Sequence, residues 1–237
     1  MKLNYQLTIF LLLFSLQTFA TWSIIIVDKN TGEIGMAGAS CTDDVYNIGK
    51  IIPGKGAIIV QAESNNDARQ IGFEMINAGY SSQAILNVLK RKTYLPWDQQ
   101  YAVVTLNKSG YARAYTGKNV PANKGILTSR EFSIQGNTLA SKMAIKLIYI
   151  AIKKAQRQGK SIQEILMIAL RAGATAGGDS RCGTQVASSA FIFVSKPNDL
   201  PNKPYFNLTV SGETAKKDNA VLLLQNMFDD YYTHHTK

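Results

Sequence analysis

Short apolar runs rich in β-branched residues recur along the chain, and turn-forming residues separate them. Runs of about four to eight such residues are typical of β-strands. The first two runs flank residues 28–32, so we predict a hairpin that brings Thr21 close to residues 39–41. Residues 107–110 are predicted to form the turn of a second hairpin. The predicted strands cover residues 22–27, 33–40, 57–62, 101–106, 111–116, 131–135, 185–194 and 206–210.

Between the strands, apolar residues recur at the 3.6-residue period of amphipathic helices. Ser81 is predicted to cap the second helix, while Gly79 and Gly173 are predicted to end the first and the fourth. The predicted helices cover residues 65–77, 81–92, 138–157, 161–172 and 214–231.

The order of these elements predicts an α+β fold. Strands alternate with helix pairs, and neither an internal repeat nor a long linker divides the chain. Because each element must bury its apolar face, we expect two mainly antiparallel sheets to pack together with helices on both outer faces. This arrangement is a four-layer αββα sandwich, and residues 21–237 are expected to form it as a single domain.

The first 20 residues have the pattern of an export signal. Lys2 gives a positive start, residues 9–16 are mostly apolar, and Thr18 and Ala20 are the small residues that a signal peptidase requires. We therefore expect residues 1–20 to be removed and the protein to be periplasmic or secreted, meeting a membrane only during export. An uncleaved signal anchor is the weaker alternative, because a membrane span needs about 20 apolar residues.

Cleavage after Ala20 would leave Thr21 as the first residue of the mature chain. An N-terminal Thr combines a nucleophile with a base. Its hydroxyl can attack a carbonyl while its own α-amine, with an unperturbed pKa of about 7.7–8.0, takes the proton. Some residue must follow every cleavage site, however, so the junction alone does not establish catalysis.

The chain has the composition of a globular protein, with 46% hydrophobic and 18% charged residues. Its net charge of +10 falls to +9 without Lys2, and such a charge favours anionic partners such as envelope polymers. The basic residues are scattered and lack the aromatic interleaving of a nucleic-acid platform. No nucleic-acid partner is therefore expected.

Histidine chemistry and metal chemistry are both disfavoured. The only histidines are His234 and His235, among the last four residues, and chain ends are usually loosely held. A Ser-His or Cys-His hydrolase and a His-based metal site are therefore not expected. We predict neither a metal nor another cofactor.

Cys41 and Cys182 are the only cysteines of the chain. An even count in an exported protein suggests a disulfide, because compartments outside the cytoplasm permit one. Two separate buried thiols are the alternative. A single pair is too few for a four-ligand zinc site.

Two polar segments lie at junctions between predicted elements. Residues 135–137 lie where a strand gives way to a helix, so Asn137 is either a helix N-cap or an amide donor to an oxyanion. Residues 177–183 join a helix to a strand. There Asp179 and Arg181 either orient a ligand or form a local ion pair in a structural turn.

Three motifs, in the same order along the chain, resemble the uncharacterised DUF1028 family. The resemblance spans nearly the whole chain after residue 20 and implies the αββα fold of the N-terminal nucleophile (Ntn) hydrolases. The two cysteines resemble the exported branch of the family, which favours a Cys41–Cys182 bridge. The motifs are Thr21-Trp22-Ser23-Ile24, Gln135-Gly136-Asn137 and the segment from Ala176 to Cys182 with Ser188-Ser189-Ala190 after it.

The junction and the resemblance together suggest an exported Ntn-type hydrolase that cleaves an amide bond in a small amide or peptide-like substrate. Thr21 and Asn137 are the expected catalytic residues. Ser40, Asp179 and Arg181 are expected to lie near the substrate, to bind it or to orient the amine. The alternative is a catalytically inactive exported binding or scaffold protein with the same fold. Either protein is compatible with a homo-oligomer.

Overall fold

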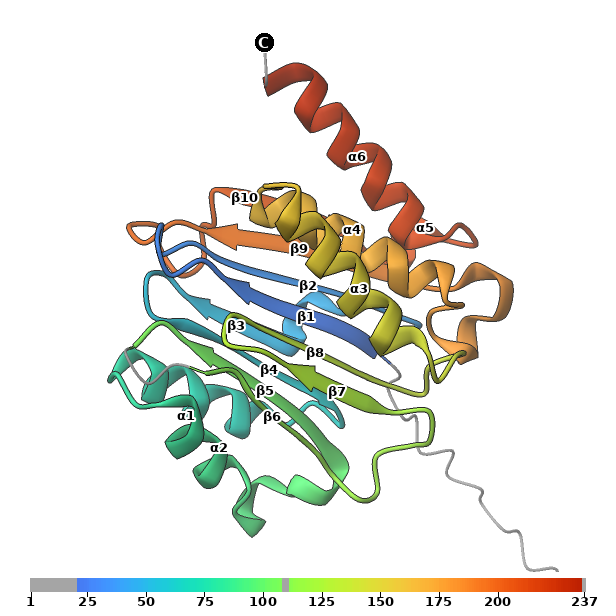
Figure 1. Ribbon diagram of the computed structural model, residues 1–237. Coiled ribbons are helices and arrows are strands. Elements are labelled where there is room, and N and C mark those ends of the chain that lie inside the picture. Colours follow the sequence, from blue (N-terminus) through green and yellow to red (C-terminus); the bar gives the residue numbers. More distant parts are fainter. Residues whose placement is uncertain (1–20, 108–110, 236–237) are drawn as a thin grey trace, which may run out of the picture.

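The computed structural model describes residues 21–107 and 111–235 as a mixed α+β fold, in which helices flank two antiparallel sheets (Figure 1). The larger sheet has six strands in the order β10-β9-β2-β1-β8-β7, and the smaller has four in the order β3-β4-β5-β6. β1 lies inside the larger sheet, with β2 and β8 as its antiparallel neighbours. The predicted fold class is confirmed at this level.

The bounds of the elements in the described part of the chain are as follows. The strands are β1 (Thr21–Val27), β2 (Ile34–Ser40), β3 (Gly49–Ile52), β4 (Gly56–Ala62), β5 (Gln99–Thr105), β6 (Arg113–Thr116), β7 (Gly125–Thr128), β8 (Phe132–Asn137), β9 (Ser189–Ser195) and β10 (Phe206–Val210). The helices are α1 (Asn66–Asn77), α2 (Ser82–Leu89), α3 (Ala144–Arg157), α4 (Ile162–Thr175), α5 (Gly212–Ala215) and α6 (Ala220–His235). Short 3-10 helices cover Tyr46–Ile48, Lys92–Tyr94, Pro96–Asp98 and Ser180–Gln185.

An apolar cluster fills part of the space between the two sheets. It combines Ile25, Met36 and Phe191 of the larger sheet with Ile59 and Val104 of the smaller one. Helices cover the opposite faces. α3, α4 and the start of α6 pack on the six-stranded sheet, while α1 and α2 pack on the four-stranded sheet (Figure 1).

The side chains of β1 alternate between these two environments. Trp22 and Ile24 belong to the cluster under the helices, whereas Ile25 faces the second sheet. Thr21 and Ser23 share the face of Ile25, because strand residues two apart point the same way. The space between the sheets is therefore apolar toward one end of β1 and polar at the end where Thr21 lies.

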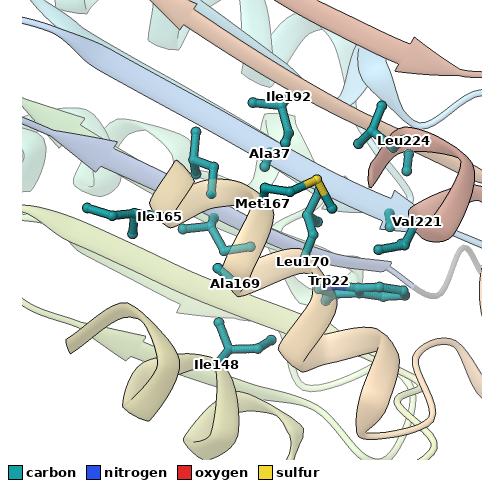
Figure 2. Packing of buried hydrophobic residues seen from close by; sticks show 14 of the residues in the cluster. Trp22, Ala37, Ile148, Ile165, Met167, Ala169, Leu170, Ile192, Val221 and Leu224 are labelled. Atoms are coloured by element: carbon teal, nitrogen blue, oxygen red, sulfur yellow. The ribbon is translucent and has the colours of Figure 1, made fainter. Parts of the chain in front are cut away.

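Helix α4 packs closely on the larger sheet. Met167 and Leu170 of α4 lie in the same cluster as Trp22 (Figure 2). The prediction that Gly173 ends this helix is wrong, because α4 continues to Thr175. Gly173 instead permits the close contact, since a Cβ at this position would lie 2.3 Å from Trp22 Nε1.

Helix α3 begins at Ala144, six residues later than the sequence pattern predicts. β8 continues to Asn137 because it pairs with β1 as far as Thr21. Thr138 then adopts a left-handed φ of +49°, and the N–H groups of residues 138–140 donate to carbonyls of other loops. The interpretation of Asn137 as a helix N-cap is therefore wrong.

The N-cap of α2 follows the sequence prediction, and α1 has an N-cap of the same kind. Asn65 and Ser81 each accept a hydrogen bond from the backbone N–H three residues later. Gly79 follows α1 with a left-handed φ of +83°, which glycine adopts without steric cost.

The element pattern differs from the prediction in further details. The pattern does not predict β3 or β7, which are four-residue edge strands. β9 begins at Ser189 because residues 180–185 form a 3-10 helix. The last predicted helix is divided into α5 and α6 near Lys216, whose φ is +51°. In the predicted 107–110 turn, residues 108–110 lie outside the described residues, while the flanking β5 and β6 are paired.

Candidate functional site

Thr21, Ser40 and Asn137 lie side by side in the larger sheet. In the antiparallel register, Thr21 is opposite Ser40 on β2 and opposite Asn137 on β8, so the three side chains share the face toward the second sheet. All three are buried, and Thr21 is 2% exposed. The Thr21 hydroxyl donates a hydrogen bond to Ser40 Oγ at 3.2 Å. Strand pairing thus assembles a polar row from residues that are distant in sequence.

Two glutamines of the smaller sheet hold this row from the opposite side. Gln61 Nε2 donates to the Thr21 carbonyl at 3.3 Å and to Gln100 Oε1 at 2.9 Å. Gln100 Oε1 also accepts a hydrogen bond from Asn137 Nδ2 at 3.1 Å, and Gln100 Nε2 donates to the Gly136 carbonyl at 2.9 Å. These bonds fix both the backbone at Thr21 and the amide of Asn137.

A second polar layer supports the first. Ser23 donates to Gln61 Oε1 and accepts a hydrogen bond from Gln135 Nε2 at 2.6 Å, while Ser133 donates to Gln135 Oε1 at 2.8 Å. Buried polar groups are costly without partners, and a connected network of them favours one rigid arrangement. In the described part of the chain, the hydroxyl of Ser189, opposite Ser40 on β9, is an exception that has no partner.

A cavity of about 230 Å³ lies beside Thr21. Ser40 and Asn137 are not part of its lining and flank Thr21 on the two neighbouring strands. The volume is below the range of about 300–1,000 Å³ that is typical of drug-sized ligands, so the cavity suits a small group. The polar lining includes Thr21, Thr42, Asp44, Gln61, Ser64 and Arg69.

The backbone beside the cavity is strained. Ala62 and Ser64 have left-handed φ values of +72° and +51°, which residues other than glycine rarely adopt. Ser64 Oγ holds this turn by donating to the Val60 carbonyl at 3.0 Å and by accepting from Arg69 at 3.0 Å. Strain of this kind persists only where the surroundings fix it, and it concentrates at functional sites.

Asp179 and Arg181 form an ion pair at 2.7 Å in the loop after α4. The buried Asp179 carboxylate also accepts a hydrogen bond from the backbone N–H of Cys41 at 2.7 Å. Cys41 and Cys182 form a disulfide with a Cα–Cα distance of 5.5 Å, as expected. The loop is therefore tied to the end of β2 directly after Ser40.

The sequence-predicted residues divide into two groups in space. Thr21, Ser40 and Asn137 are brought together, whereas Asp179 and Arg181 pair with each other and do not line the cavity. Their expected role in substrate binding stays a prediction.

Sequence reasoning missed Gln61, Gln100 and Arg69. The burial of Arg69 could have been predicted from the sequence, because Arg69 lies three residues before Gly72 and seven before Ile76, on the apolar face of α1.

Burial lowers the pKa of Arg69 from its ordinary value. In residues 21–107 and 111–235, no three or more His, Cys, Asp or Glu side chains come together where a metal ion could bind. Within the same residues, no helix combines the length and the apolar character that a bilayer span requires.

Comparisons with known proteins agree on one family. The model described as a family of unknown function, DUF1028, matches residues 21–218. The crystal structure of a DUF1028 protein from Silicibacter pomeroyi superposes with a TM-score of 0.74, with 21% identity and with 91% of each chain covered. This similarity shows a shared fold. None of the curated proteins matches the chain.

Proposed function

The chain belongs to the DUF1028 family, and from this premise we propose that it is an exported amidohydrolase whose nucleophile is the hydroxyl of an N-terminal Thr21. One observation carries the proposal. The family match begins at Thr21, and the buried hydroxyl of this residue lies in a polar row next to a cavity. A nucleophile needs this combination of a fixed position and access to a ligand.

We infer that the fold is the αββα sandwich of the Ntn hydrolases. Support comes from the two antiparallel sheets that face each other and from the helices on both outer faces. In this interpretation β1 is the interior strand that carries the nucleophile at its first residue.

The proposed reaction has two halves. The Thr21 hydroxyl attacks the amide carbonyl while its proton passes to the free α-amine of the same residue. The carbon–nitrogen bond then breaks, and the α-amine returns the proton to the leaving nitrogen, which leaves an ester on Thr21. Water attacks this ester with the α-amine as base, and a carboxylic acid and free Thr21 are released.

Asn137 is the proposed oxyanion donor. Gln100 accepts one of its two Nδ2 hydrogens, and the proposal assigns the other to an oxygen that develops charge beside Thr21. Ser40 accepts from the Thr21 hydroxyl and holds its rotamer. Asp179 and Arg181 keep the disulfide loop against the end of β2.

Export is part of the proposal, because removal of residues 1–20 must free the Thr21 amine. The Cys41–Cys182 disulfide supports export, since such bonds persist in oxidising compartments. The mature protein would then meet a small amide or peptide-like substrate outside the cytoplasm.

Labelling with an electrophilic amide mimic tests the nucleophile. N-terminal sequencing and intact mass of the exported protein should first give a chain that begins at Thr21. The mimic should then add to residue 21, and Thr21→Ser should keep part of the labelling while Thr21→Ala loses it. Thr42→Ala is the matched control, because Thr42 lines the same cavity and should not be needed.

Two results would overturn the enzyme proposal. One is a mature chain that begins elsewhere than Thr21. The other is equal labelling of the Thr21→Ala and wild-type proteins. Either would favour the binding or scaffold protein with the same fold.

A further inference from the structure

Arg69 is a buried cation in the wall of the cavity beside Thr21. Its side chain is 8% exposed, and its guanidinium donates to Ser64 Oγ at 3.0 Å and to Asn66 Oδ1. These bonds use two of its five N–H groups. In the described part of the chain, no carboxylate forms an ion pair with it.

A buried charge without a counter-charge is costly, and proteins usually pair one. Burial is the only cause that shifts the pKa of Arg69, and a guanidinium stays protonated even so. Arg181, in the loop after α4, has the carboxylate of Asp179 as its partner. Among the residues that the structure describes, no carboxylate pairs with Arg69 as Asp179 pairs with Arg181.

The acidic groups around the cavity leave this charge uncompensated. Asp44 lines the cavity but is exposed, and its carboxylate accepts hydrogen bonds from Tyr46 N at 3.0 Å and Asn47 Nδ2 at 2.7 Å. Asp67 is exposed in the first turn of α1. α1 also begins at the cavity with Asn66, so the positive end of its dipole adds to the charge of Arg69.

We propose that Arg69 binds a carboxylate of the ligand that enters this cavity. The substrates are then small amides that carry a carboxylate, such as N-acyl amino acids or short peptides. A guanidinium binds a carboxylate through two parallel hydrogen bonds, which fixes both position and orientation. The identity of the bond that is cut rests on the proposed function, whereas carboxylate binding needs only the cavity and Arg69.

Calorimetric titration of the purified exported protein with succinate and with succinamide tests the proposal. The two probes have nearly the same shape, and only succinate carries carboxylates. Succinate should bind at least about tenfold more tightly, as expected for hydrogen bonds to a charged group. Arg69→Gln should abolish this preference, Arg69→Lys should keep part of it, and the exposed Arg91→Gln should leave it unchanged.

Two further variants separate this inference from a structural role of Arg69 and from the proposed function. Ser64→Ala removes the hydrogen bond that Arg69 gives to the strained turn but keeps the charge, so it should retain the preference for succinate. Thr21→Ala should also retain it, because the hydroxyl is not needed for binding. Equal binding of the two probes by the wild type would overturn the inference, as would loss of the preference in folded Ser64→Ala. Neither result would affect labelling at Thr21.

Discussion

Asn137 has a structural role in the sheet and a proposed role as the oxyanion donor. It is the last residue of β8, its Oδ1 accepts a hydrogen bond from Thr138, and its Nδ2 donates to Gln100 across the two sheets. These contacts fix the plane of the amide before any ligand is present. A preorganised donor of this kind stabilises charge that develops in the transition state without having to reorient.

Asn137→Ala should therefore slow labelling of Thr21 by the amide mimic by about 10²–10³-fold, the usual loss for one oxyanion donor. The exposed Asn47→Ala, which also removes an amide from the site region, should label at the wild-type rate. Both labelling rates are measured by stopping the reaction at successive times and determining the intact mass of the protein. Circular dichroism checks that the variants are folded. A wild-type rate in Asn137→Ala would remove Asn137 from the mechanism.

The proposed base predicts how the labelling rate depends on pH. An α-amine accepts a proton only when neutral, and its unperturbed pKa is about 7.7–8.0. The rate should rise as the pH increases through that range and level off above it. A variant with one Gly inserted between residues 20 and 21 displaces the amine from the Thr21 hydroxyl and should not label. A rate that does not change between pH 6 and 9 would contradict a role for the amine.

Sequence reasoning could propose Thr21 as the nucleophile because the supporting evidence is local, a cleavage pattern followed by a hydroxyl residue. Gln61 and Gln100 have no such local signature. Gln61 is the last residue but one of β4, and Gln100 is the second residue of β5, directly after Gln99. The importance of each depends on which strand of the other sheet lies opposite. That pairing is a property of the whole fold, so the network could not be derived from periodicity.

At the scale of elements, patterns within one segment predict well and contacts between segments do not. The β1–β2 hairpin follows from two β-branched or small-residue runs around a turn, and its register puts Thr21 opposite Ser40, within the predicted segment 39–41. The start of α3 could not be predicted in this way. Residues 138–140 continue an apolar pattern, but their N–H groups bond to distant loops.

Gly173 gives a prediction at this scale. Gly173→Ala should lower the free energy of unfolding by about 1–3 kcal/mol, because the new Cβ would force α4 away from Trp22. The exposed Thr175→Ala on the same helix should change it by less than about 0.5 kcal/mol. Urea unfolding followed by tryptophan fluorescence measures both. Equal stability of Gly173→Ala and wild type would show that the helix can shift without cost.

At the scale of the whole molecule, the space between the sheets has a polar end and an apolar end. The apolar cluster around Ile25 and Ile59 joins the two sheets by burial, while the hydrogen bonds around Gln61 and Gln100 join them at the Thr21 end. Hydrogen bonds are directional and apolar burial is not. Burial at the apolar end therefore holds the two sheets together, while the hydrogen bonds at the polar end fix the positions of the side chains. A site that needs fixed donors is expected at the polar end.

The disulfide connects residues 141 positions apart and closes the loop beside this polar end. Its removal should lower the free energy of unfolding by about 2–5 kcal/mol, because the unfolded chain gains the freedom that the bridge denies it. Urea unfolding of the wild type with and without a reducing agent measures this loss, and Cys41→Ser with Cys182→Ser should match the reduced protein. That double variant should not respond to the reducing agent.

Because Asp179 also holds Cys41 by a hydrogen bond to its N–H, the folded variant should keep its labelling at Thr21 at low denaturant. If labelling is lost while the fold is retained, the bridge positions the site and does more than stabilise the chain.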